Sequence, residues 1–269
     1  PLVIDKTTPS CGNSRFGCWT CTVVNKDKAI HGLVESGEVW MKPLLKFRDQ
    51  LYQSSLPENK TKYRNHKRRS GRIDFHKKYV EGVGRSNEIE LDQDGQAKHV
   101  PGPYWLKVRK RWLKKLLTIE KKINENGQSI ELISRDELHV IRREWITDPN
   151  EPDWEDSLPN IFQTVYPDED MEWANNDLGF FDLDGLNAVT KTGKDLNIAP
   201  ELLKKIIDIE VEVSGLGNRR GLTDKIEKVL RQDWGNLEDA FGDRLKSNNA
   251  INEFKNKRED LQAKLGEFS

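Results

Sequence analysis

The spacing of apolar residues predicts that most of this chain is helical. Trp40, Leu44, Phe47 and Leu51 recur at intervals of four, three and four residues, which is the period of one helix face. Pro43 lies inside this pattern. Because proline is tolerated in the first turn of a helix and breaks its interior, Pro43 predicts a late start or a kink.

The longest apolar stripe predicts a helix of about five turns between Tyr104 and Ile123. Asn126-Gly127 follows it and is a pair that commonly ends a helix. Further on, Ser134-Arg-Asp-Glu137 has the form of a capping box, in which serine and glutamate satisfy two free N–H groups at a helix start. We therefore expect the next helix to begin at Ser134.

Two other regions have distinct patterns. The last third of the chain contains apolar stripes over 202–213 and 226–230, followed by a charged and exposed helix over 243–265. Between residues 72 and 100 the pattern instead gives two short strand-like pieces, Arg72–Phe75 and Glu88–Leu91. Asp92–Gly95 offers turn residues, which together with these pieces predict a small hairpin.

The predicted fold class is therefore mainly α with a small β-hairpin element. We divide the chain into a cysteine segment (1–35), a basic helical region with the hairpin (36–147), an acidic irregular segment (148–190) and a C-terminal helical region (191–269). The acidic segment has too many aromatic residues to be freely disordered. We expect it to wrap the rest of the fold or to cover a partner surface.

Charge is distributed unevenly, although the net charge of the chain is only -1. Residues 42–122 contain 22 Lys and Arg against 9 Asp and Glu, whereas residues 144–184 contain 13 Asp and Glu and no Lys or Arg. Such asymmetry indicates one part that faces a polyanion and one acidic part. Alternatively, the two parts neutralise each other within the fold.

Length and composition narrow the class of protein. At 269 residues the chain is long enough for one large or two small domains. No run approaches the roughly 20 apolar residues that span a bilayer, and no basic-then-apolar leader opens the chain. We expect a cytoplasmic protein with no membrane partner. The chain begins at Pro1, in a stretch that reads like the interior of a protein, so we also expect a fragment that lacks its N-terminal part; a processed N-terminus is the alternative.

All three cysteines, Cys11, Cys18 and Cys21, lie within eleven residues. Thiols gathered in this way commonly share a metal or a redox partner. Iron–sulfur clusters use cysteine thiolates, usually four, so either a fourth thiol lies upstream or one iron is left open. Zinc is the rival metal, with His31 as a candidate fourth ligand. Three unligated thiols are the remaining alternative.

Residues 59–72 are basic and lack periodicity, so we expect an exposed loop there, which we call the basic loop. It contains the candidate phosphate contacts Lys67, Arg68, Arg69 and Arg72. Lysine and arginine on such a loop give affinity for phosphates without reading sequence. The polyanion could be DNA, a nucleotide or another subunit, and a solvated charged face is the plainer interpretation. No glycine-rich phosphate loop or nucleophile motif is found, so the catalytic residues stay unknown.

Several segments together resemble the DndC family, the sulfurtransferase-type components of bacterial DNA phosphorothioation systems, which are themselves similar to phosphoadenosine phosphosulfate reductases. The resemblance covers most of residues 1–235, and its most specific part is Cys11-Gly-Asn-Ser-Arg-Phe-Gly-Cys18-Trp-Thr-Cys21-Thr-Val-Val. Four other segments agree with the family: Trp40–Asp49, Pro101–Leu117, Leu132–Leu138 and Arg219–Glu227.

The resemblance implies that Cys11, Cys18 and Cys21 hold a 4Fe–4S cluster and that the protein takes part in ATP-dependent sulfur transfer to the DNA backbone. Its implied partners are DNA and other phosphorothioation-system proteins, including a cysteine desulfurase. The family's phosphate loop, Ser-Gly-Gly-x-Asp-Ser, would bind ATP and Mg²⁺ and is absent from this sequence. The implied fold class is thus the C-terminal portion of an α/β phosphosulfate-reductase-like (PP-loop ATP pyrophosphatase) protein without its nucleotide-binding part.

Two alternatives stay open at this point. One is a zinc-stabilised nucleic-acid-binding module without catalysis. The other is a phosphoadenosine phosphosulfate reductase-like or other thiolation enzyme.

Overall fold

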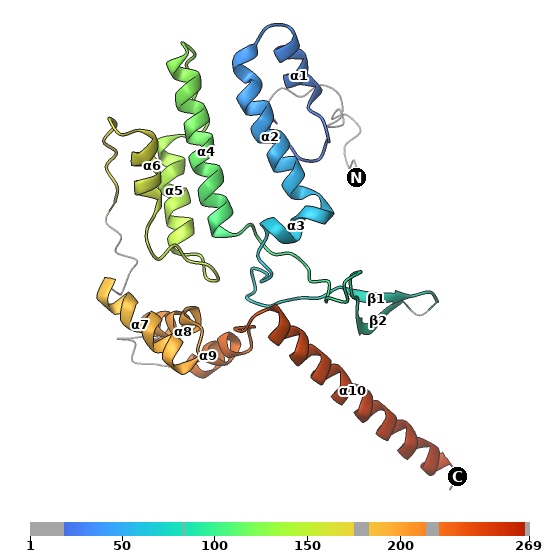
Figure 1. Cartoon of the computed structure of the whole chain (residues 1–269). Coiled ribbons are helices and arrows are strands. Elements are labelled where there is room, and N and C mark those ends of the chain that lie inside the picture. Colours follow the sequence, from blue (N-terminus) through green and yellow to red (C-terminus); the bar gives the residue numbers. More distant parts are fainter. Residues whose placement is uncertain (1–18, 83, 175–182, 214–220, 267–269) are drawn as a thin grey trace. The chain divides into compact units, whose positions relative to one another are not determined.

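The computed structural model describes residues 19–82, 84–174, 183–213 and 221–266. Within these ranges the chain forms ten α-helices, one short 3-10 helix and one two-stranded antiparallel hairpin (Figure 1). The mainly α prediction with a small hairpin is therefore confirmed. The chain divides into two compact units, each built from separate stretches of sequence. Unit 1 comprises residues 1–64, 104–148 and 152–178, and unit 2 comprises residues 65–103, 149–151 and 179–269.

In unit 1, helix α4 (Leu106–Glu125) packs against α5 (Arg135–Ile146) and α6 (Leu158–Val165) (Figure 1). Apolar side chains from all three helices form a core, and Leu117, Leu138, Leu158 and Phe162 are completely buried in it. Removing apolar surface from water is the main stabilising term in such a core.

The opposite face of α4 packs against α2 (Lys42–Ser55), through Leu44 and Phe47 on one side and Val108 and Trp112 on the other. Three short elements complete this part of unit 1: α1 (Lys28–Glu35), the 3-10 helix Val39–Met41 and α3 (Pro57–Tyr63). Because both faces of α4 are covered, this helix carries two apolar stripes, which explains its long periodic pattern.

The predicted helix boundaries agree with the structure. Pro43 lies in the first turn of α2, so it marks a late start and not a kink. Helix α4 ends at Glu125 with Asn126 as its C-cap, and Gly127 adopts the left-handed conformation with φ of +90°. The capping box at Ser134 and Glu137 is present in α5.

Two sequence-based expectations in this region need correction. Helix α3 occupies the first part of the stretch 59–72, which was expected to be a loop. Helix α6 lies inside the segment that was expected to be irregular. Its buried residues explain the difference, because Leu158, Phe162 and Val165 become a helix face only when α4 and α5 are there to cover them.

Unit 2 contains the hairpin of β1 (Lys77–Val80) and β2 (Gly84–Ile89), with Tyr79 opposite Arg85. The expected turn at Asp92–Gly95 is present. The two paired strands, however, both lie before this turn in the sequence, and Arg72–Phe75 is not a strand. Within this stretch only Phe75 makes an isolated bridge, to His99. Short strands with little apolar alternation leave the pairing poorly specified by sequence alone.

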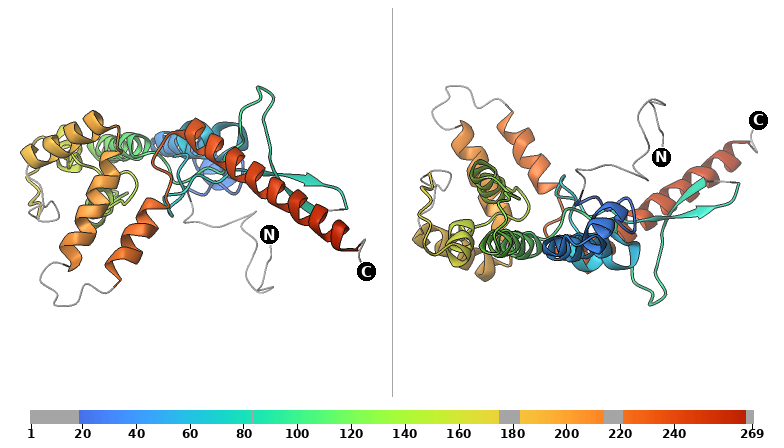
Figure 2. Two further views of the ribbon diagram at one scale, coloured as in Figure 1. Left: turned by 90° about the horizontal axis from the view of Figure 1, so that it is seen from below. Right: turned by 90° about the horizontal axis from the view of Figure 1, so that it is seen from above.

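The rest of unit 2 is helical: α7 (Leu183–Leu196), α8 (Pro200–Val213), α9 (Leu222–Leu230) and α10 (Leu237–Gly266). Helix α8 contacts both α7 and α9. The first part of α10 runs beside the hairpin segment (Figure 2), where Phe75 contacts Phe241 at a ring separation of 5.8 Å. Across the described ranges, none of the helices has the length and apolar character that crossing a membrane requires.

Candidate functional site

The cysteine segment is described only at its C-terminal end. Cys11 and Cys18 lie outside the described residues, so the predicted metal ligands stay a prediction. Cys21 is a half-buried free thiol. His31 is half-buried in α1. In the part of the chain that the structure describes, no three His, Cys, Asp or Glu side chains gather to hold a metal ion.

A buried arginine anchors this end of the segment on helix α2. The side chain of Arg48 has no exposed surface. Its guanidinium donates hydrogen bonds to the backbone oxygens of Cys21 (3.1 Å), Asn25 (2.7 Å) and Val24. One aromatic contact adds to this anchor, between Trp19 and Phe47 at a ring separation of 6.1 Å.

The Arg48 contacts have a chemical consequence for Cys21. A buried charge needs several hydrogen bonds to offset its lost hydration, so Arg48 fixes the backbone of residues 21–25 against the helix. It also places a positive charge one hydrogen bond away from the backbone of Cys21. Net charge and hydrogen bonds near a metal–thiolate group tune its reduction potential. The arrangement therefore fixes the backbone that carries the Cys21 side chain beside a buried positive charge.

The four predicted phosphate contacts of the basic loop differ in their surroundings. Lys67 is half-buried in unit 2, with its ammonium 5.0 Å from the centre of the Trp234 ring. Burial lowers the pKa of Lys67, against the opposing effect of two nearby carboxylates. Arg68 donates to the backbone oxygen of Pro101 at 2.9 Å. The two exposed side chains of the set are Arg69 and Arg72.

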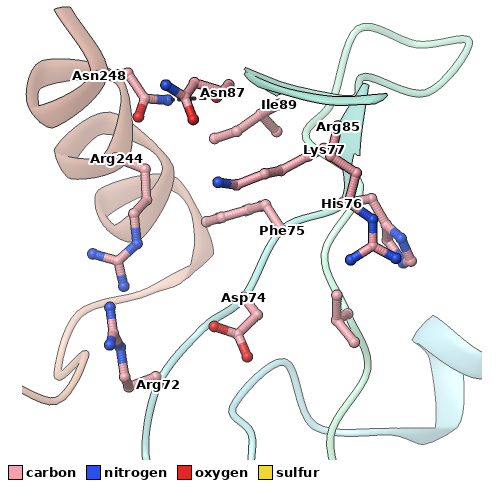
Figure 3. A pocket seen from close by; sticks show the side chains of 11 residues that line it. Arg72, Asp74, Phe75, His76, Lys77, Arg85, Asn87, Ile89, Arg244 and Asn248 are labelled. Atoms are coloured by element: carbon pink, nitrogen blue, oxygen red, sulfur yellow. Dashed lines mark hydrogen bonds between the residues drawn. The ribbon is translucent and has the colours of Figure 1, made fainter. Parts of the chain in front are cut away.

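Arg72 belongs to a cavity of about 610 Å³ in unit 2 that is lined by basic side chains, which we name the basic cavity. Its cations come from three elements: Arg72 from the loop, Lys77 and Arg85 from the two hairpin strands, and Arg244 from α10. Asp74 is the acidic side chain among its lining residues. In Figure 3 the guanidinium groups of Arg72 and Arg244 face each other, and Lys77 extends toward α10.

The walls of the basic cavity are held by hydrogen bonds. The carboxylate of Asp233 accepts from Arg244 Nη2 at 3.0 Å and from the backbone N–H of Ile73 at 2.7 Å. Across the cavity, Asn248 Nδ2 donates to the backbone oxygen of Asn87 at 2.9 Å (Figure 3). These bonds join α10 to the loop and to the hairpin, so the side chains around the cavity stand on a common frame.

Electrostatically, the cavity retains excess positive charge. Arg244 is paired with Asp233, and Asp74 lies 3.9 Å from Arg68 Nε. Arg72, Lys77 and Arg85 have no carboxylate within 4.0 Å among the residues described. Sequence reasoning missed Lys77, Arg85 and Arg244. The only sequence signal for Lys77 and Arg85 was the general basic character of residues 42–122.

Comparisons with known proteins add no assignment, because no protein-family model, no curated protein and no solved structure matches this chain. The functional argument therefore depends on the chain's own residues.

Proposed function

We propose that this chain belongs to a DndC-like sulfurtransferase that takes part in placing sulfur on the DNA backbone. Cys11, Cys18 and Cys21 would hold its 4Fe–4S cluster, with DNA and the other phosphorothioation proteins, including a cysteine desulfurase, as partners. One structural observation supports the proposal: buried Arg48 fixes the backbone at Cys21 and leaves the thiol free.

This support concerns the chemistry of the donor set. A metal site needs ligand atoms that are held in place, and the backbone that carries the Cys21 thiol is fixed by its hydrogen bond to Arg48. A bound 4Fe–4S cluster would need a fourth ligand besides these three cysteines. That ligand would be either a thiolate outside this sequence or an external sulfur atom on an open iron. What this chain contributes is a backbone that is held at Cys21 by Arg48 and at Trp19 by the contact of its ring with Phe47.

ATP and Mg²⁺ enter the proposal only through the resemblance. The sequence contains no Ser-Gly-Gly-x-Asp-Ser loop, so no residue is proposed to cleave ATP. A phosphosulfate-reductase-like origin of the fold is likewise part of the proposal.

Metal content tests the proposal directly. After anaerobic purification, the full chain is expected to contain iron and acid-labile sulfide, and Cys21→Ala is expected to lose both. Stoichiometric zinc without iron would overturn the sulfur-transfer proposal and would favour a zinc-stabilised nucleic-acid-binding module.

A second measurement tests the reaction. The sulfurtransferase to which this chain is proposed to belong, including its nucleotide loop, is produced in cells together with the other phosphorothioation proteins. The digested DNA is then examined by mass spectrometry for phosphorothioate linkages. Loss of the linkages in the Cys21→Ala variant, with the protein still present, is the expected result. Unchanged linkage levels in that variant would refute the role of the cysteine segment.

A further inference from the structure

We propose that the basic cavity of unit 2 binds the phosphodiester backbone of DNA through Arg72, Lys77 and Arg85. The site uses no residue of the cysteine segment, and only the choice of DNA as the polyanion rests on the proposed function. The first argument is charge. These three exposed cations have no carboxylate within 4.0 Å among the described residues. Like charges around one cavity repel each other, and a bound anion removes that repulsion.

The second argument is the frame that presents the cations. Arg72, Lys77 and Arg85 come from a loop and two strands of unit 2. The Asn87–Asn248 hydrogen bond joins the hairpin to α10, and Asp233 joins the loop to α10 by accepting from both Ile73 and Arg244. Side chains that are placed on a fixed frame lose less freedom when a ligand binds. The basic cavity therefore differs from a run of solvated charged residues, because the side chains of such a run do not line a common cavity.

The third argument distinguishes a polymer backbone from a small phosphate compound. In Figure 3 the Arg72 and Arg244 side chains lie on the α10 side of the cavity, Lys77 lies centrally and Arg85 lies on the far side. The cations are thus spread along the cavity and do not converge on one point. Asp74 among the lining residues disfavours a single dianion enclosed from all sides. Spread single charges suit successive phosphates of one strand.

Salt dependence of DNA binding provides the test. The probe is a short fluorescent DNA duplex of random sequence, and its anisotropy gives the dissociation constant at several KCl concentrations. Each neutralised phosphate contributes about 0.9 to the slope of log affinity against log salt. The double variant Lys77→Ala/Arg85→Ala is therefore expected to lower the slope by about 1.8. Between about 50 and 200 mM KCl its affinity should fall about 12-fold less than that of the wild type.

The matched control removes two lysines nearby that are already paired. Lys78 lies next to Lys77 and contacts Glu88 at 2.8 Å, and Lys98 pairs with Glu90. Lys78→Ala/Lys98→Ala changes the net charge by the same amount and is expected to leave the slope unchanged. An equal decrease of the slope in both double variants would overturn the proposal, because the effect would then come from the net charge of the protein and not from contacts in the basic cavity.

Charge-conserving variants separate charge from folding. Lys77→Arg/Arg85→Lys is expected to retain the wild-type slope. If the alanine variant unfolds, Lys77→Gln and Arg85→Gln give the same test singly, at about 0.9 in slope each. A wild-type slope in either of these glutamine variants overturns the assignment of that residue.

Competition distinguishes the source of the phosphate. Inorganic phosphate and ATP, compared with KCl at equal ionic strength, are expected to displace the duplex no better than KCl. Stronger displacement by either one would identify a small-molecule site and would overturn the DNA assignment. Iron content is measured on the same preparations. Zinc in place of iron refutes the proposed function and leaves the comparison of salt slopes valid. A wild-type salt slope in Lys77→Ala/Arg85→Ala refutes only DNA binding at the basic cavity.

Discussion

Arg48 is expected to be the residue on which the position of the cysteine segment depends. The perturbation is Arg48→Met, which keeps much of the side-chain length and removes the charge and all its donors. In the wild type the guanidinium donates to three backbone oxygens between residues 21 and 25, and the side chain is fully buried. The variant leaves those oxygens without this donor.

The expected magnitude follows from these contacts. Hydrogen bonds from a charged group contribute about 1.5–3 kcal/mol each. Asn25 is exposed, so water can replace part of its bond. Removing a buried charge also recovers hydration free energy. Asp49, the acidic neighbour at 3.2 Å, has a side chain that is 49% exposed and so is little affected by the loss. We expect Arg48→Met to lower the free energy of unfolding by about 3 kcal/mol.

Two assays check this expectation. Urea unfolding measures the global loss, with Arg111→Met as the control, because Arg111 is an exposed residue of α4 and its loss should change stability by less than about 0.5 kcal/mol. Alkylation followed by peptide mass spectrometry measures the local effect, and Cys21 should react faster in Arg48→Met. Wild-type unfolding midpoints and wild-type alkylation of Cys21 in this variant would refute the reasoning.

Three further predictions concern other contacts. Gly102→Ala is expected to lower the free energy of unfolding by about 3 kcal/mol, because its Cβ would lie 1.8 Å from the backbone oxygen of Lys67. Gly32→Ala in helix α1 should raise the free energy of unfolding by about 0.5–1 kcal/mol, because nothing lies within 4 Å of its Cβ. Thermal or urea unfolding measures both. The pKa of Tyr166 is raised above its ordinary value of 10.0 by burial and by the hydrogen bond to Glu120. Its contribution to stability is therefore complete below pH 10.0 and decreases as the pH rises further, which alkaline unfolding of the wild type and of Tyr166→Phe measures. Because burial lowers the pKa of Lys67, its acetylation rate should reach half-maximum at a lower pH than is usual for lysine, as measured by peptide mass spectrometry.

Each of these predictions has a result that would contradict it. Equal stability of the two glycine variants would mean that the loop at Gly102 yields without cost. Identical alkaline unfolding curves for the wild type and Tyr166→Phe would remove the role assigned to the phenol. An ordinary pH profile for Lys67 acetylation would show that its ammonium is more hydrated than its contact with Trp234 indicates.

The parts of the fold that depend on local signals were predictable from sequence. Helix α4 has a periodic stripe over its whole length, and α5 has a complete capping box. The charged helix expected over 243–265 lies within α10. Helix α6 was not predictable in this way, because it has only eight residues and contains a proline. So short a helix is stable only when other elements bury one face of it.

The candidate sites were predictable from sequence only where a single motif marks their residues. Cysteine spacing pointed to the cysteine segment, but nothing in the sequence of α2 marks Arg48 as buried. Its acceptors are backbone oxygens 23 to 27 residues away, and a backbone oxygen has no sequence signature. In the basic cavity, Arg244 lies far along the chain from Arg72 and Lys77. Only the folded unit brings these three residues to one cavity.

The uneven charge along the chain can now be interpreted by unit. Within unit 1 the acidic stretch supplies partners to the basic helices: Asp148 lies 3.0 Å from Arg109, Asp153 lies 2.6 Å from Lys110, and Glu169 lies 2.8 Å from Arg135. Neutralisation within the fold therefore accounts for these three carboxylates and for the charges of Arg109, Lys110 and Arg135.

The same reasoning leads to a different result in unit 2. Arg72, Lys77 and Arg85 come from the same basic region of sequence, but among the described residues they have no carboxylate within 4.0 Å. Pairing with the acidic stretch accounts for only part of the charge on α4, because the exposed Arg111 and Lys114 of that helix also have no carboxylate within 4.0 Å among the described residues. What distinguishes the three cations of unit 2 is that they line one cavity whose walls are joined by hydrogen bonds, and binding of a polyanion is therefore expected there.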